Sequence, residues 1–234
     1  MSQPFNLSKP NRPIHIGVIL MAGVTEILDV APIDMIYGLT KHFLDQVPST
    51  LVGSQLKSEA LEEAHFHWIS EAGPSVPSRL TSGISLLPTD DFATCPTLDI
   101  VLIGAHNIGY NPSEAELAFT RKVYEECAAF ITICAGVEVP LRAGILQDKT
   151  ATGPREFMPM LRAMSPGTNW VEKRWVRDGK LWTSGALLNG LDLMRGFGEE
   201  VWGSGKEGGG LVGKMLDMGG FPVRDVDYRD VDRE

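Results

Sequence analysis

The segment from Ala129 to Glu138 constrains the fold of this chain more than any other. An apolar, β-rich run ends at Cys134, and two small residues then open an apolar-periodic stretch that continues to Ile145. This pattern predicts a sharp strand-to-helix turn with the cysteine at its tip, the geometry of a nucleophile elbow. We expect the positive end of the helix to favour the thiolate, which attacks electrophilic carbon. A buried structural cysteine fits the local sequence equally well.

Short apolar runs alternate with amphipathic stretches along the chain, which is typical of an α/β sheet with helices on both faces. Strong strands are predicted at 14–21, 98–104 and 129–133, weaker ones at 51–52 and 66–70, and helices at 31–43, 112–128 and 186–202. Arg177-Asp178-Gly179 between two apolar runs predicts a β-hairpin. We expect a flavodoxin-like, doubly wound domain with a mostly parallel sheet and its site at the carboxyl ends of the strands.

The two ends of the chain differ in character from its middle. We predict an N-terminal extension at 1–13, the α/β domain at 14–202, and a glycine-rich segment with a charged tail at 203–234. The N-terminus lacks the basic and apolar regions of a signal peptide, and no apolar stretch approaches the length of a membrane span. We therefore expect a cytoplasmic protein.

Charge and composition exclude several classes of partner and cofactor. The net charge is -9, with 30 acidic against 21 basic residues, so neither nucleic acid nor an anionic membrane is expected to bind. No phosphate-loop or dinucleotide-binding signature is present, and we expect no cofactor. The three cysteines match neither a zinc site nor a disulfide framework. His65 and His67 share a face of a possible strand, but no partner stands at a recognisable ligand spacing, so we expect a solvent-facing pair and no metal.

Several short motifs follow one another across most of the chain. They are Ile16-Gly17-Val18-Ile19-Leu20, Ile27-Leu28-Asp29-Val30-Ala31-Pro32-Ile33-Asp34, Asp99-Ile100-Val101-Leu102-Ile103-Gly104-Ala105, Ile133-Cys134-Ala135-Gly136, Leu141-Arg142-Ala143-Gly144-Ile145-Leu146, and Trp175-Val176-Arg177-Asp178-Gly179-Lys180-Leu181-Trp182-Thr183-Ser184-Gly185. Their order and spacing resemble the ThiJ/PfpI superfamily, the class I glutamine amidotransferase-like proteins that include isonitrile hydratases and the parkinsonism-associated deglycase. The resemblance implies that Cys134 is the reactive residue.

The resemblance also implies a carboxyl partner for the cysteine. In the family, a carboxyl group from the loop after the first strand approaches the sulfur, and Asp29 matches that position. A carboxyl there hydrogen-bonds the sulfur or moves a proton between water and substrate. Because the loop before Pro32 is one residue shorter than in many relatives, Glu26 is a second candidate. The alternative role for Asp29 is a helix N-cap just before Pro32.

The family's oxyanion pocket consists of backbone N–H groups, and the matching residues here are Gly104 or Ala105, together with Ala135. Small residues suit such a pocket because a backbone donor must come close to the developing negative charge. Tight packing at strand ends explains the same small residues. His106 follows in the same loop and is a possible general base or substrate donor, although a lone histidine is more often structural.

The chain departs from the family pattern in one respect. Many relatives carry a histidine that pairs with the cysteine, where this chain has Thr150-Ala151-Thr152-Gly153-Pro154-Arg155. Protease or amidotransferase chemistry is therefore not expected. A cysteine with an acid resembles isonitrile hydratases, in which the sulfur attacks the terminal isonitrile carbon, water adds and an N-formamide leaves. Ala135, however, stands where those enzymes usually have threonine.

Two functions from different classes remain open. The first is a cofactor-independent cysteine enzyme, a lyase of the hydratase type, acting on a small electrophile. It either hydrates an isonitrile or, like a glyoxalase, converts a 2-oxoaldehyde such as methylglyoxal to a hydroxy acid. The second is a redox-sensing or stress-response protein whose Cys134 is oxidised without substrate turnover. Because relatives are commonly dimers, we expect a homodimer.

Overall fold

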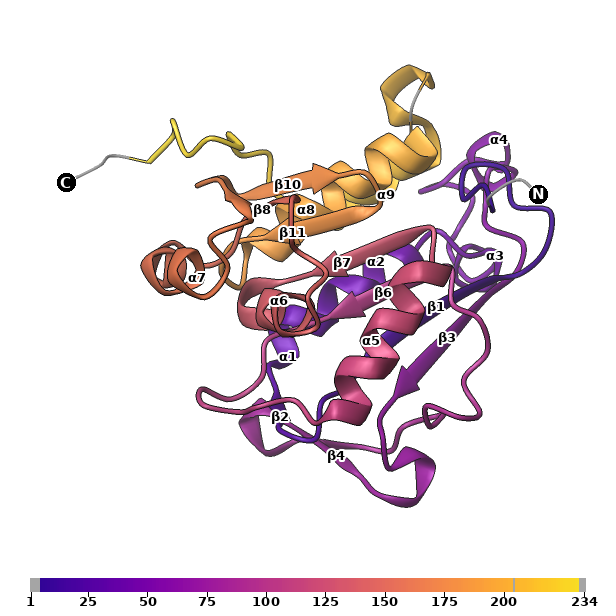
Figure 1. Ribbon diagram of the computed structural model, residues 1–234. Coiled ribbons are helices and arrows are strands. Elements are labelled where there is room, and N and C mark those ends of the chain that lie inside the picture. Colours follow the sequence, from indigo (N-terminus) through magenta and orange to yellow (C-terminus); the bar gives the residue numbers. More distant parts are fainter. Residues whose placement is uncertain (1–4, 204, 232–234) are drawn as a thin grey trace.

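A six-stranded sheet between two layers of helices forms the centre of the computed structural model, which describes residues 5–203 and 205–231 (Figure 1). Along the sheet the strands are β10 (Trp175–Asp178), β11 (Leu181–Ser184), β7 (Ala129–Thr132), β6 (Ile100–Ile103), β1 (Ile14–Ile19) and β3 (Ala64–Ile69). All neighbours pair in parallel except β10 and β11, which form the predicted hairpin. The predicted flavodoxin-like α/β fold is confirmed.

Helices cover both faces of this sheet. Figure 1 shows α5 (Glu114–Glu126) and α6 (Glu138–Arg142) in front of it, with α2 (Asp34–Tyr37) and α8 (Asn189–Gly198) behind. Side chains of each strand alternate between two apolar cores: in β6, Leu102 packs into the core behind the sheet and Val101 into the core under α5. Burial on both faces explains why these strands are almost continuously apolar in sequence.

The smaller elements surround this framework. The helices are α1 (Ile27–Val30), α3 (Lys41–Leu44), α4 (Ser54–Lys57), α7 (Met158–Met164) and α9 (Gly210–Met218), and the strands are β2 (Val24–Thr25), β4 (Ser78–Leu80), β5 (Ser85–Leu86), β8 (Thr150–Ala151) and β9 (Asn169–Trp170). The predicted helix at 31–43 is broken into pieces, because Thr40 is extended and its hydroxyl caps α3 by accepting from the Phe43 N–H at 3.2 Å. No strand forms at 51–52, where a turn leads to α4.

Both ends of the described chain pack against the domain. The helix predicted at 186–202 is α8, followed by a π-helical turn at Glu199–Gly203, whose Trp202 indole donates to the Leu7 carbonyl at 2.8 Å. Helix α9, which was not predicted from the sequence, buries Leu211 and Leu216 in the core. Tyr228 is buried and donates to the Asn189 side chain at 2.9 Å. More of the segment after residue 202 is therefore packed than a linker and tail would be.

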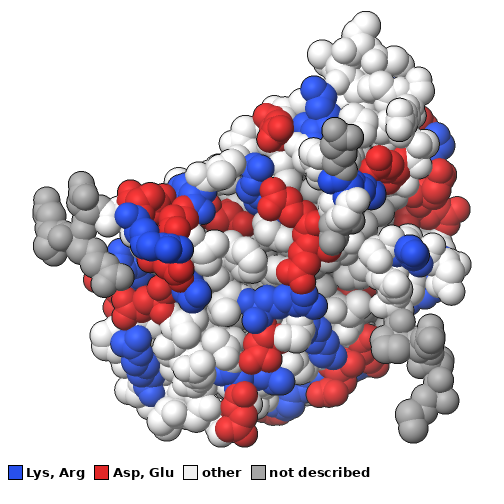
Figure 2. All heavy atoms as spheres, turned by 90° about the horizontal axis from the view of Figure 1, so that it is seen from above, with Lys and Arg blue, Asp and Glu red and all other residues white. Residues whose placement is uncertain are grey.

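The surface carries charges of both signs. In the view from above, acidic and basic side chains are interspersed rather than gathered into a basic patch (Figure 2). Among the described residues, no helix is both long and apolar enough to cross a membrane.

Candidate functional site

The turn predicted at the end of β7 is present, and Cys134 occupies its tip. Ile133 is still extended, whereas Cys134 has a φ of 58° and begins a 3-10 turn that leads directly into α6. A positive φ is uncommon outside glycine, so surrounding contacts must hold this backbone in place. The Cys134 N–H donates to the Gly185 carbonyl at 3.0 Å and thereby ties the elbow to the end of β11.

Two glycines let the loops around the elbow approach one another. A Cβ atom at Gly136 would lie 2.5 Å from the Ile103 carbonyl oxygen, and one at Gly104 would lie 2.9 Å from the Cβ of Asp29. Real Cβ atoms do not come that close, so both positions need glycine. The close approach brings α1 and the loops after β6 and β7 together at the carboxyl ends of the strands.

Glu26, Asp29 and Cys134 meet there and are called the thiol cluster below. The Cys134 sulfur and one carboxylate oxygen from each acid all lie within 4.8 Å of one another. Asp29 is fully buried; its Oδ2 accepts from the Ala105 N–H at 2.9 Å, while its Oδ1 has no hydrogen-bond partner. Asp29 lies inside α1 and caps no helix, so the capping alternative is wrong.

Burial controls the protonation of this cluster. It raises the pKa of Asp29 to about 7, with Glu26 adding repulsion against the Ala105 hydrogen bond that lowers it. It also raises the pKa of the Cys134 thiol to about 11, with the Asp29 charge as the second cause. The expected preference for the thiolate is therefore not met, because desolvation outweighs the backbone donors. At neutral pH the sulfur carries a proton next to a carboxyl poised to accept or release one.

The backbone donors differ in part from those the sequence indicated. The N–H groups of Leu187 and Ala135 lower the pKa of the thiol by donating toward the sulfur. Ala135 was among the predicted oxyanion donors and Leu187 was not, because only the pairing of β11 with β7 brings the loop after β11 to the elbow. The N–H of Ala105 is taken by Asp29, which leaves it unavailable to a substrate oxygen in this arrangement. Gly104 serves the close approach described above.

Among the described residues, His106 is not a member of the thiol cluster. Burial lowers the pKa of its imidazole, so the ring is neutral at pH 7. The ring packs edge-on against Tyr110 at 5.1 Å, and its buried Nδ1 has no hydrogen-bond partner. This nitrogen remains a candidate contact for a substrate.

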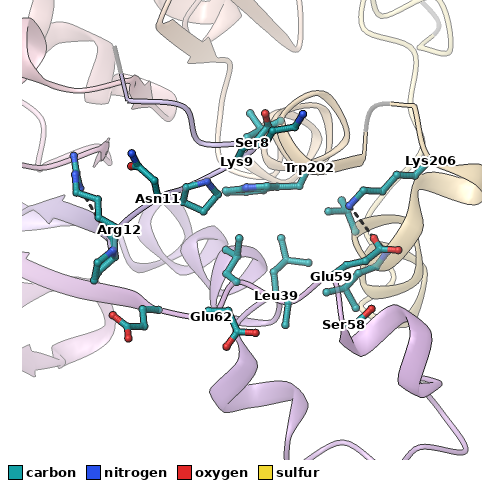
Figure 3. A pocket seen from close by; sticks show the side chains of 18 residues that line it. Ser8, Lys9, Asn11, Arg12, Leu39, Ser58, Glu59, Glu62, Trp202 and Lys206 are labelled. Carbon is teal, nitrogen blue, oxygen red and sulfur yellow. Dashed lines mark hydrogen bonds and ion pairs between the residues drawn. The ribbon is translucent and has the colours of Figure 1, made fainter. Parts of the chain in front are cut away.

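A large hollow lies elsewhere in the described part of the chain. It measures about 770 Å³ and lies at the amino ends of β1 and β3, between segments 8–13 and 58–63 and the end of the helix at Trp202 (Figure 3). In Figure 3 Trp202 crosses its middle, and Lys206 pairs with Glu59 at 2.8 Å. None of the predicted site residues lines it. The chemistry is therefore assigned from the thiol cluster and not from cavity size.

The side chains of the thiol cluster are of types that can bind a metal ion. A thiolate and two carboxylates are ligand types that zinc accepts. Here, however, the sulfur keeps its proton well above neutral pH, and an ion would have to displace it. That the reaction uses no metal ion stays a prediction.

Comparisons with known proteins match both the sequence and the fold. The sequence model of the DJ-1/PfpI family matches residues 59–200. The isonitrile hydratase of Pseudomonas putida is 32% identical over 130 residues, which are 55% of this chain and 56% of that protein. The match thus spans little more than half of the relative's length.

Solved structures agree over nearly the whole chain. A ThiJ/PfpI family protein from Pseudomonas syringae superposes with a TM-score of 0.67 at 18% identity, covering 92% of this chain and 77% of that one. An AraC family transcriptional regulator from Pseudomonas putida gives 0.65 at 17% identity, covering 88% and 99%. DJ-1beta from Drosophila melanogaster gives 0.62 at 18% identity, covering 91% and 100%. At these identities the structures establish the fold alone.

Proposed function

Because the chain belongs to the DJ-1/PfpI family, we propose that it is a cofactor-independent cysteine enzyme that hydrates a small isonitrile. Cys134 is the nucleophile and Asp29 carries the proton. The observation that supports this most is the fully buried carboxyl of Asp29 in the thiol cluster, whose Oδ1 has no hydrogen-bond partner and whose pKa burial raises to about 7. The 32% identity to an isonitrile hydratase favours this substrate class over other electrophiles.

The first step joins sulfur to carbon. The ionised Asp29 accepts the thiol proton while the sulfur bonds to the terminal carbon of the isonitrile, and it then delivers that proton to the same carbon. The product is a thioimidate that carries one new C–S bond and one new C–H bond. A carboxyl with a pKa of about 7 both takes and gives a proton readily near neutral pH.

The second step releases the product. Water adds to the thioimidate carbon, and Asp29 or Glu26 takes one of its protons and passes it to the imine nitrogen. As the C–S bond of the resulting tetrahedral adduct breaks, its hydroxyl group gives its proton to the same carboxyl, and an N-formamide leaves. The sulfur departs as an anion toward the N–H groups of Leu187 and Ala135 and then regains its proton from the carboxyl. The sum is one isonitrile plus one water giving one formamide.

A glyoxalase-like reaction is the second candidate, and the presence of two carboxyls favours it. The sulfur adds to the aldehyde carbon of a 2-oxoaldehyde, and a carboxyl moves a proton from that carbon to its neighbour, which leaves a thioester. Water then cleaves the thioester to the hydroxy acid. Glu26 and Asp29 lie close enough to the sulfur for one to move the carbon-bound proton while the other serves the oxygen.

The redox-sensor alternative is less consistent with the cluster. Oxidation by peroxide proceeds through the thiolate. A cysteine that is 9% exposed and whose pKa is about 11 presents little thiolate at neutral pH. Turnover in a substrate assay would therefore exclude a stress-response protein that has no catalytic activity.

The test pairs two substrates with one oxidant. Hydration of p-nitrophenyl isocyanide and conversion of methylglyoxal are followed for the native chain, for Cys134→Ala and for the matched control Cys127→Ala. We expect isocyanide turnover in the native chain and in the control only. Intact mass after mild peroxide is measured in parallel. Formation of sulfinate on Cys134 without turnover of either substrate would contradict the proposed enzyme and support the redox sensor.

We also propose that the protein is a cytoplasmic homodimer. An apolar groove of about 190 Å³ lies between the segment from α1 to α2 and the loop after β11, and its lining residues Leu28 and Leu188 are 50% and 53% exposed. A second copy would bury these side chains. Light scattering on the native chain and on Leu188→Glu tests the dimer, which we expect to dissociate in the variant, and fractionation of cells tests the compartment. No binding to nucleic acid is expected in either form.

A further inference from the structure

Three histidines gather on one face of the sheet, away from the thiol cluster. His15 belongs to β1, and His65 and His67 belong to the edge strand β3. The parallel register pairs His15 with His65 and Gly17 with His67, so all three side chains rise from the same face. The His15 ring stacks on the other two, with centroid distances of 5.3 Å to His65 and 5.2 Å to His67.

A carboxylate orients the central pair of imidazoles. His15 Nδ1 lies 3.0 Å from His67 Nε2, and the Nδ1 of His67 lies 2.9 Å from Asp90 Oδ2. Asp90 is itself held in place, since the Thr89 hydroxyl donates to it at 2.6 Å and its backbone pairs with Ile69 of β3. A carboxylate acceptor fixes the proton of His67 on Nδ1 and leaves the Nε2 lone pair directed at His15. Proteins orient metal-binding histidines in the same way.

We propose that His15, His65 and His67 bind one divalent transition-metal ion of the zinc type. The ion takes the place of the proton between His15 Nδ1 and His67 Nε2, and the His15 ring stays neutral by carrying its proton on Nε2 instead. His15, His65, His67 and Asp90 are called the histidine cluster below. This site is independent of the proposed enzymatic function, because none of its members belongs to the thiol cluster.

The central pair of histidines requires only a small movement to bind an ion, and His65 requires a larger one. Zinc binds imidazole nitrogen at about 2.0–2.1 Å, so two nitrogens on one tetrahedral ion lie about 3.4 Å apart. The central pair at 3.0 Å must therefore open by only a few tenths of an ångström. Among the described residues, the three histidines do not bring one ring nitrogen each to within 4.8 Å of one another, so the His65 ring must turn toward the ion. It has room to do so because His65 is exposed at the sheet edge. Water supplies the fourth ligand, as in three-histidine zinc sites.

Bound there, the ion would link strand β1 to the edge strand β3. Through Asp90 it would also reach segment 89–90, which extends the sheet beside β3, where the Thr89 N–H donates to the Trp68 carbonyl at 2.7 Å. Beyond the short contact with segment 89–90, β3 has a strand neighbour on one side only, as edge strands do. The role that fits this placement is stabilisation of the sheet edge.

The test must separate this site from the thiol cluster. We therefore use Cys134→Ser as the parent protein, because it removes the thiol ligand, and titrate it with ZnCl₂ by calorimetry. The expected result is one bound ion and a rise in melting temperature. His67→Gln and His65→Gln should each weaken binding by at least about 10-fold, and Asp90→Asn by about 10-fold. His42→Gln is the matched control, since His42 is exposed on α3, and it should bind as the parent does.

Two results would overturn the proposal. One is a parent protein that binds no zinc while remaining folded by circular dichroism. The other is zinc binding that is unchanged in both His67→Gln and His65→Gln. Because both positions lie on the edge strand, these variants decide the question even where His15→Gln fails to fold.

Discussion

The thiol cluster and the histidine cluster both consist of polar side chains at the same sheet, but they differ in their position on it and in their burial. The first lies at the carboxyl ends of the strands, where the elbow and two glycines press backbone against backbone and bury Asp29 completely. The second lies on the face of β1 and β3, where residue register brings side chains together at half-exposed positions. Close approach of backbone segments forms the first site. The register of β1 and β3, with side chains alternating between the two faces of the sheet, forms the second.

The two clusters also differ in how their polar atoms are satisfied. In the histidine cluster, both ring nitrogens of His67 have partners. In the thiol cluster, Oδ1 of Asp29 has none although it is buried, and burial raises the pKa of both Asp29 and Cys134. An unsatisfied buried group costs stability and is retained where chemistry uses it. The comparison therefore predicts reactivity at the first cluster and binding at the second.

The largest effect should come from removing the nucleophile. In Cys134→Ala, we expect hydration of p-nitrophenyl isocyanide to fall by about 10⁴-fold or more, because no other group forms the covalent adduct. Steady-state kinetics measures it, with Cys127→Ala as the control for a buried thiol whose pKa burial raises to about 12. Equal losses in the two variants would show that turnover depends on core packing and not on a nucleophile at the elbow.

Replacing the carboxyl should lower the rate and raise the stability. In Asp29→Asn we expect turnover to fall about 100-fold, the range for a lost proton carrier. The unfolded chain loses the Asp29 proton near its usual pKa of 3.8, while the folded chain keeps it to about 7. The free energy of unfolding of the native protein therefore falls as the pH rises through this window, and it stays low above it.

Asparagine carries no charge to bury and still accepts from the Ala105 N–H. The Asp29→Asn variant should consequently be more stable than the native chain by about 2 kcal/mol at about pH 8, and by little at about pH 4. Urea unfolding at the two pH values measures this difference. Asp34→Asn serves as the control, because Asp34 is an exposed carboxyl on α2 outside the thiol cluster. A variant less stable than the native protein at the higher pH would show that the Asp29 charge is stabilised rather than strained.

The sequence was sufficient for the fold and for the position of the elbow. A continuous apolar run followed by Cys134 and two small residues allows few arrangements other than a buried strand and a sharp turn. Asp29 followed from the family resemblance, and its contact with Ala105 depends on a loop that the resemblance had already placed beside the elbow. Local pattern and motif order carry this information because each element is formed by consecutive residues.

What could not be predicted depends on neighbours distant in sequence. Leu187 joins the site only because β11 lies next to β7, and His15 joins His65 only through the register of β1 and β3. The rise in the pKa of Cys134 reflects depth of burial, which no short motif encodes. Helix α9 was missed because its start lies in a glycine run; Gly209, with a φ of 75°, forms the turn before it.

The pH dependence of the rate gives a smaller effect that sharpens the assignment of Asp29. Only the ionised carboxyl accepts the thiol proton, and burial raises its pKa to about 7. The value of kcat/KM should therefore rise roughly 10-fold between about pH 6 and about pH 8 and then level off. The residual activity of Asp29→Asn should lack this rise. A profile that keeps its inflection in the variant would move the titrating group to Glu26.

The smallest effect is expected at the histidine cluster in the absence of metal. His67→Gln removes the hydrogen bond to Asp90, whose side chain is 18% exposed, and so should lower the free energy of unfolding by about 1 kcal/mol. Turnover per folded molecule should not change, because the cluster lies on another part of the sheet from the elbow. Urea unfolding and isocyanide kinetics on the same preparation measure both quantities, with His42→Gln as the control for an exposed histidine. A fall in turnover without a loss of stability would connect the two clusters and contradict the separation of a reactive end from a binding edge.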